Sequence, residues 1–155
     1  MDRFTKMAEN LLSNLETYRQ GRRRRGSAST PSIDKNLDKL RGLSWRKDDD
    51  VNDDPSHELA HAMIAPPSRR KLKRFGLGPI GMGNGSKSCR EEEEASILGI
   101  LLQKEHGLDW RWTAVDHAWR FDVFSVKNAA TCLKSLHKRR LIYMNGRPTF
   151  CRKAS

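Results

Sequence analysis

Two histidines and a glutamate near the middle of the chain have the spacing of a zinc-protease motif. Residues 57–61 read HELAH, so His57, Glu58 and His61 match the pattern H-E-x-x-H. On a helix this spacing puts both imidazoles on one face, where they can share a metal ion, and it lets the glutamate activate a water molecule. The pattern raises the hypothesis of a zinc metallopeptidase.

The residues around the motif speak against that hypothesis. A working zinc peptidase needs a third ligand, a supporting strand and a dry cleft. The acidic run at 48–54 and the proline-rich, basic stretch at 65–70 are not expected to build such walls. The longer form of the motif is absent, because Ile64 and Pro67 stand at its last two key positions.

A third ligand could in principle come from the run of acids Glu91 to Glu94. We interpret these acids instead as the first turn of a helix, where the helix dipole favours negative charge. The motif is therefore interpreted as chance. We expect no enzymatic activity and no cofactor, and at most an adventitious zinc or nickel ion at His57 and His61.

The composition indicates a folded part and disordered parts. Of 155 residues only 36% are hydrophobic and 32% are charged, which is too polar for one core that uses the whole chain. A net charge of +11 favours polyanionic partners, mainly nucleic acid. Three scattered cysteines without a CxxC pair fit a reducing compartment. No secretory signal and no run long enough to span a bilayer is recognised, so we expect a soluble, intracellular protein.

The N-terminal half is expected to be flexible, with short amphipathic helices. Residues 1–20 predict a helix with an apolar seam, which either joins the chain to a second copy or a partner, or packs on its own domain. Two basic clusters, one in 21–32 and one in 68–76, are compatible with nuclear import. Their cations are Arg22, Arg23, Arg24, Arg25, Arg69, Arg70, Lys71, Lys73 and Arg74. The glycine-rich stretch at 76–86 contains a literal G-x-G-x-x-G but lacks the flanking strand and helix, so we interpret it as a linker.

From residue 88 onward the pattern becomes that of a folded domain. It predicts a helix over 88–106, a short strand over 108–112, a helix over 113–121 and a regular helix over 125–139. Asn145-Gly146, flanked by alternating residues, predicts a β-hairpin near the end of the chain.

This order resembles the winged helix-turn-helix family over roughly the last 60 residues. The resemblance is carried by ILGILL (97–102), DWRWT (109–113), the helix at 125–139 and NGRPTF (145–150). One departure is Arg140, which stands where the family often has a glycine before the first wing strand.

The resemblance implies that the helix at 125–139 lies in the major groove of DNA and that the hairpin borders the minor groove. Early polar residues of the helix would reach base edges, and the later cations and the wing arginine would contact phosphates. The residues concerned are Lys127, Asn128, Thr131, Lys134, Lys138, Arg139, Arg140 and Arg147.

The sequence thus predicts a mainly α chain with a small β-hairpin: an amphipathic helix at 1–20, a flexible charged region at 21–87 and a winged-helix domain at 88–155. We expect a regulatory protein that binds nucleic acid, with DNA favoured over RNA, in the nucleus if the source is eukaryotic or viral and otherwise in the cytoplasm. The alternatives are a viral accessory or adaptor protein whose winged helix docks a protein, and a zinc metallopeptidase that uses HELAH.

Overall fold

The computed structural model describes residues 2–20, 31–33, 35–36, 55–66, 68, 86–108, 110 and 125–149. Its long elements are the helices α1 (Arg3–Gln20), α3 (Pro55–Ile64), α5 (Ser86–Glu105) and α7 (Val126–Lys138). None of the described helices is long and apolar enough to cross a membrane. Several sequence predictions lie outside the described residues, namely both basic clusters, the acidic run, the glycine-rich linker and the helix at 113–121.

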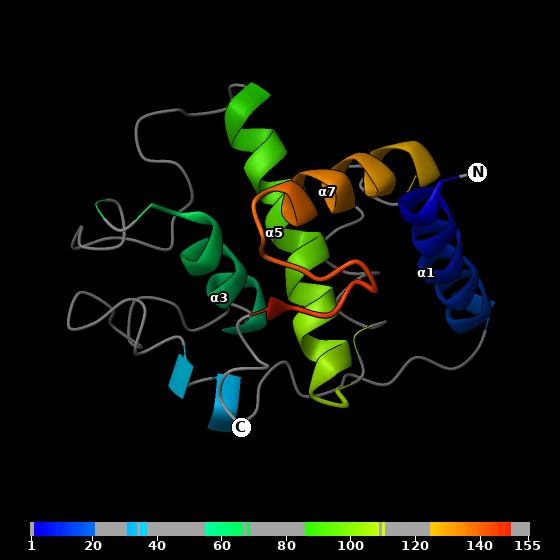
Figure 1. Ribbon diagram of the computed structural model, residues 1–155. Helices are drawn as coiled ribbons and strands as arrows, with labels where there is room; N and C mark the ends of the chain where they lie inside the picture. Colours follow the sequence, from blue (N-terminus) through cyan, green and yellow to red (C-terminus); the bar gives the residue numbers. More distant parts are fainter. Residues whose placement is uncertain are drawn as a thin grey trace.

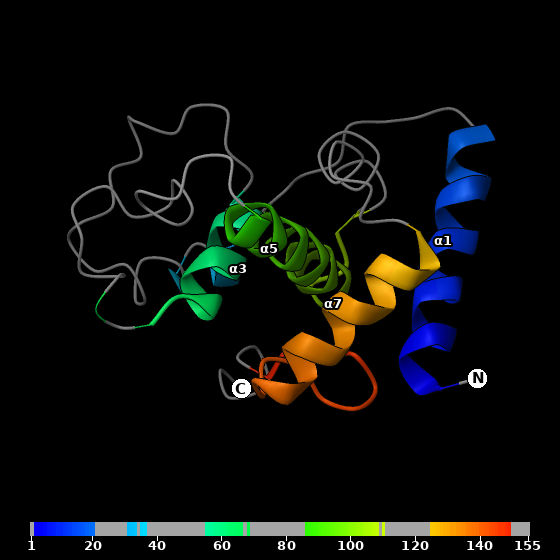
Figure 2. The same ribbon diagram turned by 90° about the horizontal axis from the view of Figure 1, so that it is seen from above.

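Helix α5 is the centre of the described part (Figures 1 and 2). It packs against α3 on one side and against α7, which in turn packs against α1. Because neighbours cover α5 from more than one direction, its middle is buried almost all round, and Ile97, Leu98, Ile100 and Leu102 are each at most 1% exposed.

The predicted helices at 1–20 and 125–139 are confirmed as α1 and α7. Ser125 caps α7, because its Oγ accepts a hydrogen bond from the backbone N–H of Asn128 at 3.1 Å. The expected apolar stripe of α7, which includes Cys132, Leu133 and Leu136, is buried. The apolar face of α1, including Ala8 and Leu11, belongs to the same core, so α1 packs within its own chain.

The predicted winged-helix fold is wrong. The described residues form helices and contain no strand or sheet; beyond the last helix they hold a single antiparallel bridge between Ile142 and Pro148. The Asn145-Gly146 turn itself is present, with Gly146 at φ 86°, and Tyr143 N–H donates to the carbonyl of Arg147 at 2.8 Å. Within residues 141–149 one residue pair bridges the two arms of this turn, which is fewer than the strands of a wing require.

The starts of α3 and α5 decide which residues lie in the interior of each helix. α3 begins at Pro55, so Ser56 lies inside the helix and not at its N-cap, and the helix ends at Ile64, before Pro66-Pro67. α5 begins at Ser86, and no acid stands in its first turn. The acids Glu91 to Glu94 therefore lie beyond the turn in which the helix dipole acts, and the interpretation of these acids as a helix N-terminus is wrong.

Candidate metal centre at the contact of two helices

His57 and His61 lie on the face of α3 that packs against α5. One helical turn separates them, and their rings meet edge to face with centroids 4.7 Å apart. Their Nε2 atoms are 3.1 Å apart, so both rings direct the same nitrogen toward one point. The HELAH motif thus forms the helix that its spacing requires.

Glu92 of α5 completes this point from the opposite side. Its Oε2 lies 3.0 Å from Nε2 of His57, and its Oε1 lies 3.0 Å from Nε2 of His61. Each of the three residues offers one atom that could bind a metal, and these three atoms all lie within 4.8 Å of one another. Two ligands of a tetrahedral zinc ion with bonds of 2.0–2.1 Å stand roughly 3.3 Å apart, so the observed spacing is close to that of a ligand set.

The three residues differ in how deeply their side chains are buried. The side chain of His61 is 1% exposed, that of His57 21% and that of Glu92 27%. The cluster is therefore anchored in the core through His61 and open to solvent on the side of His57 and Glu92. An open side is what a metal centre needs if water or a substrate is to reach a fourth position.

The electrostatics of the cluster favour a cation. Burial disfavours the charged form of His61, but hydrogen bonds to Glu91 and Glu92, with the charges of Glu92 and Glu58, outweigh it and raise the pKa of His61 to about 9. Burial alone would raise the pKa of Glu92, whereas its hydrogen bonds to His57 and His61 hold that pKa well below its usual range. The site is thus built to hold positive charge between its carboxylates, supplied by a proton or by a metal ion.

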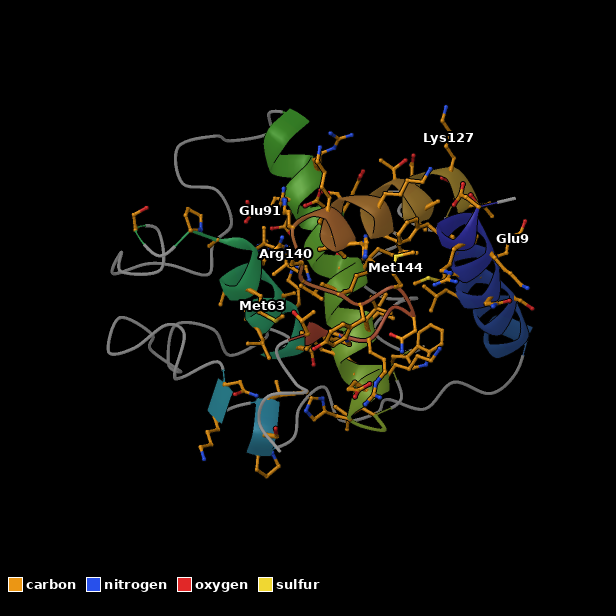
Figure 3. The ribbon with its side chains drawn as sticks, viewed as in Figure 1. Glu9, Met63, Glu91, Lys127, Arg140 and Met144 are labelled. Atoms are coloured by element: carbon orange, nitrogen blue, oxygen red, sulfur yellow. The ribbon has the colours of Figure 1, made fainter. Side chains whose placement is uncertain are left out.

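Two further acids border the cluster. Glu91, on the side of α5 that faces α3 (Figure 3), has its Oε1 3.1 Å from Nδ1 of His61. Glu58 is 5% exposed, and its charge acts on His61. The second residue of the motif is therefore a buried carboxyl group beside the two histidines.

The sequence pointed to His57 and His61 as a metal pair, and the structure adds Glu92 and Glu91. These acids were considered as ligands and set aside because they were placed at a helix N-terminus. Glu91 and Glu92 could have been identified as site residues if the helix had been predicted to begin at Ser86, because four consecutive acids then lie in the helix interior. Acids in the interior of a helix cannot be stabilised by the helix dipole and need other partners.

The predicted nucleic-acid residues are spread over α7 and the turn after it. Lys127, pointing away from the body in Figure 3, Thr131 and Lys138 are exposed, and Asn128 is half-buried. Arg140 is exposed and has φ 61°, the left-handed conformation that favours glycine.

The other three predicted contacts form ion pairs within the chain. The Lys134 ammonium lies 3.5 Å from Asp2, and the Arg139 guanidinium lies 3.2 Å from the buried carboxylate of Glu94. Arg147 donates from Nε to both carboxylate oxygens of Glu105. These cations neutralise Asp2, which precedes α1, and two acids of α5, so their charges are already paired within the chain and are not a free surface for phosphates.

Comparison with protein-family models, with curated proteins and with solved structures finds no match.

Proposed function

We propose that the chain is a metal-dependent hydrolase that binds one zinc ion through His57, His61 and Glu92 and uses Glu58 as its general base. The observation that carries this proposal is the convergence of both Nε2 atoms and the Glu92 carboxylate, at 3.0–3.1 Å from one another, across two different helices. This reverses our expectation from sequence that HELAH is a chance pattern without a third ligand.

The donor set supports zinc in particular. Two imidazoles and one carboxylate, with a fourth position left for water, are the ligands of a known type of catalytic zinc site. Structural zinc sites are instead closed by four protein ligands. The partial exposure of His57 and Glu92 leaves room for that fourth position.

The surrounding residues supply the rest of a hydrolysis. A zinc ion held by His57, His61 and Glu92 would lower the pKa of a water ligand and polarise a carbonyl group. Glu58 accepts the proton of the attacking water as its oxygen bonds to the carbonyl carbon. Glu58 then returns the proton to the leaving nitrogen or oxygen as the bond to the carbonyl carbon breaks, which yields a carboxylic acid and an amine or alcohol.

The first test measures zinc in the purified full-length chain by mass spectrometry after dialysis. We expect one zinc per chain in the wild type and none in His61→Ala. His106→Ala is the matched control, because it removes a histidine that directly follows α5 and whose Nδ1 lies 2.8 Å from the backbone carbonyl of Leu102. A wild type without zinc, after loading with stoichiometric zinc, contradicts the proposal.

The second test separates binding from catalysis. A pool of internally quenched fluorescent peptides and nitrophenyl esters is incubated with the zinc-loaded wild type and with Glu58→Gln. We expect the variant to keep its zinc and to lose at least 100-fold in rate, since general bases contribute about 10²–10⁴-fold. Equal rates for the two proteins would remove Glu58 from the mechanism.

A second candidate function is nucleic-acid binding through α7, which stays a prediction. It is supported by the exposed side chains of Lys127, Thr131 and Lys138 on one helix and by the net charge of +11. We do not retain a winged-helix mode of binding. Fluorescence anisotropy with labelled duplex DNA and RNA across a salt series tests it, with Lys127→Ala and Lys138→Ala beside the wild type; affinity that does not change with salt speaks against it.

A further inference from the structure

Four consecutive acids of α5 face different partners. Glu91 contacts Nδ1 of His61, Glu92 contacts the Nε2 atoms of both histidines, and Glu94 pairs with Arg139 of α7. The charge of Glu93 helps to raise the pKa of the Cys132 thiol on α7, after the larger effect of burial. Turning by about 100° per residue, the helix thus divides its acids between α3 and α7.

We propose that Glu91 is a positioning residue for the metal centre: it holds the ring of His61 through Nδ1, so that Nε2 offers its lone pair to the metal. This inference rests on the proposed function. A carboxylate only accepts hydrogen bonds, so Nδ1 of His61 carries the hydrogen in this contact. Nε2 of His61 faces His57 and the Glu92 carboxylate, and a metal ion bound there would replace the hydrogen on Nε2 while Glu91 keeps the hydrogen on Nδ1.

The contact between Glu91 and Nδ1 of His61 is shielded from water, which strengthens its hold on the ring. The side chain of His61 is 1% exposed and that of Glu91 is 13% exposed, so water competes little for the Nδ1 hydrogen. The two acids stand next to each other on α5 and contact the two different nitrogens of the same ring. A ring turned over would bring carbon atoms to both carboxylates, so one orientation is selected.

The contact also acts on metal affinity. A negative carboxylate on the far nitrogen increases the electron-donating strength of the ring, and loss of such a partner typically weakens metal binding about 10–100-fold. The dipole of α5 does not explain Glu91, because the helix begins at Ser86 and has no acid in its first turn. Glu91 therefore has a role of its own at His61, separate from the effect of the Glu93 charge on Cys132 of α7.

The test measures zinc affinity of the full-length chain by competition with a chromophoric chelator, for the wild type, Glu91→Ala, Glu91→Gln and Glu93→Ala. We expect Glu91→Ala to bind one zinc with 10–100-fold lower affinity. Glu91→Gln should recover part of that loss, because an amide oxygen still accepts the Nδ1 hydrogen. Glu93→Ala, the matched control from the same helix, should stay within about twofold of the wild type.

Cobalt(II) provides a readout that a purely structural role would not move. Its visible absorption bands report ligand geometry, so we expect them to shift in Glu91→Ala and to return toward the wild type in Glu91→Gln. Circular dichroism of each variant checks that the helices are intact. Glu91→Gln nearly conserves the volume of the side chain and is therefore expected to fold. It still tests the loss of the negative charge if Glu91→Ala does not fold.

The outcomes separate the two proposals. A wild type that binds no zinc overturns the proposed function and this inference with it. A wild type that binds zinc, beside a Glu91→Ala that binds it equally well with an unchanged cobalt spectrum, overturns the inference alone. An equal loss in Glu93→Ala would assign the effect to the charge of α5, and a zinc stoichiometry of zero in Glu91→Ala would make Glu91 a ligand instead of a positioning residue.

Discussion

The two outer helices, α3 and α1, both bury apolar side chains in the common core, but only α3 adds a cluster of ionisable side chains to its contact among the described residues. α3 presents His57, Glu58 and His61 toward α5, where they join Glu91 and Glu92. α1 presents an apolar face toward α7, and Asp2, which directly precedes α1, pairs with Lys134 at the exposed rim.

The difference separates the residues that stabilise the fold from those that carry chemistry. Apolar burial of the kind seen between α1 and α7 stabilises a protein by roughly 25 cal/mol per Å² removed from water. Burying charged groups costs free energy unless they are paired, and apolar residues of similar size are often as stabilising or more so. A cluster of ionisable side chains at a helix contact therefore points to function.

The largest expected effect on stability tests the apolar contact between α1 and α7. Leu11→Ala in α1 should lower the free energy of unfolding by about 2–5 kcal/mol, because the side chain is 5% exposed and its loss leaves a cavity. Urea unfolding followed by circular dichroism measures it. Glu9→Ala, on the outward side of the same helix (Figure 3), is the control and should change stability by less than about 0.5 kcal/mol. Equal effects from both changes would mean that α1 is not docked on α7.

The second prediction concerns the polar side, and it depends on the proposed zinc site. Zinc at a free concentration 100 times its dissociation constant should stabilise the folded chain by about 2.7 kcal/mol, since only the folded chain brings α3 and α5 together. Thermal unfolding with and without zinc measures the shift. The melting temperature of Leu11→Ala should rise with zinc as that of the wild type does, whereas that of His57→Ala should not respond. A response in His57→Ala would place the zinc elsewhere.

A smaller effect is expected at the contact of α5 with α7. Glu94 is 2% exposed and its Oε2 has Arg139 as its ion-pair partner, so Arg139→Met should destabilise the fold by about 1–3 kcal/mol. The double variant Arg139→Met with Glu94→Gln should recover part of this loss, because the carboxylate is then no longer left without its cation. Denaturant midpoints of the four proteins form a double-mutant cycle, and additive effects would show that the pair does not interact.

The smallest effect is expected at the start of α1. Asp2 accepts hydrogen bonds from the backbone N–H and the hydroxyl of Thr5, and these bonds, with a minor contribution from Lys134, lower its pKa from 3.8 to about 2. A pKa depressed in the folded state adds stability above pH 3.8 that is lost as the pH falls through about 2. Asp2→Asn should show a weaker loss of stability than the wild type between pH 5 and pH 2. Glu9→Gln is the control, and it should follow the wild-type curve.

Those elements whose periodicity is strong were predictable from sequence. α1 and α7 follow from apolar residues that recur with the helical period, and the end of α3 follows from Pro66-Pro67. The wing was not predictable in the same way. Asn145-Gly146 specifies a turn, and it is found, but a turn signal does not determine how many residues pair on each side of it.

Half of the candidate site was predictable. The spacing within HELAH is local and fixes His57 and His61 on one face of a helix. Glu92 follows His57 by 35 residues, and its position depends on how α3 packs against α5, which no local pattern records. Glu91 was hidden for another reason: the start of α5 was placed too late, and this made its acids look like partners of the helix dipole.

Gly99 gives the contact of α3 with α5 a property that concerns the size of the ion. A Cβ atom at this position would lie 3.2 Å from Cα and 3.3 Å from the backbone N of His57, so any side chain pushes directly on the backbone of a proposed ligand. Gly99→Ala would gain up to about 1 kcal/mol of helix propensity while it widens the gap between the helices by a few tenths of an ångström. The absence of a side chain at Gly99 thus allows α3 and α5 to approach closely, and Gly99→Ala should shift the preference of the proposed site from zinc toward a larger ion such as cadmium.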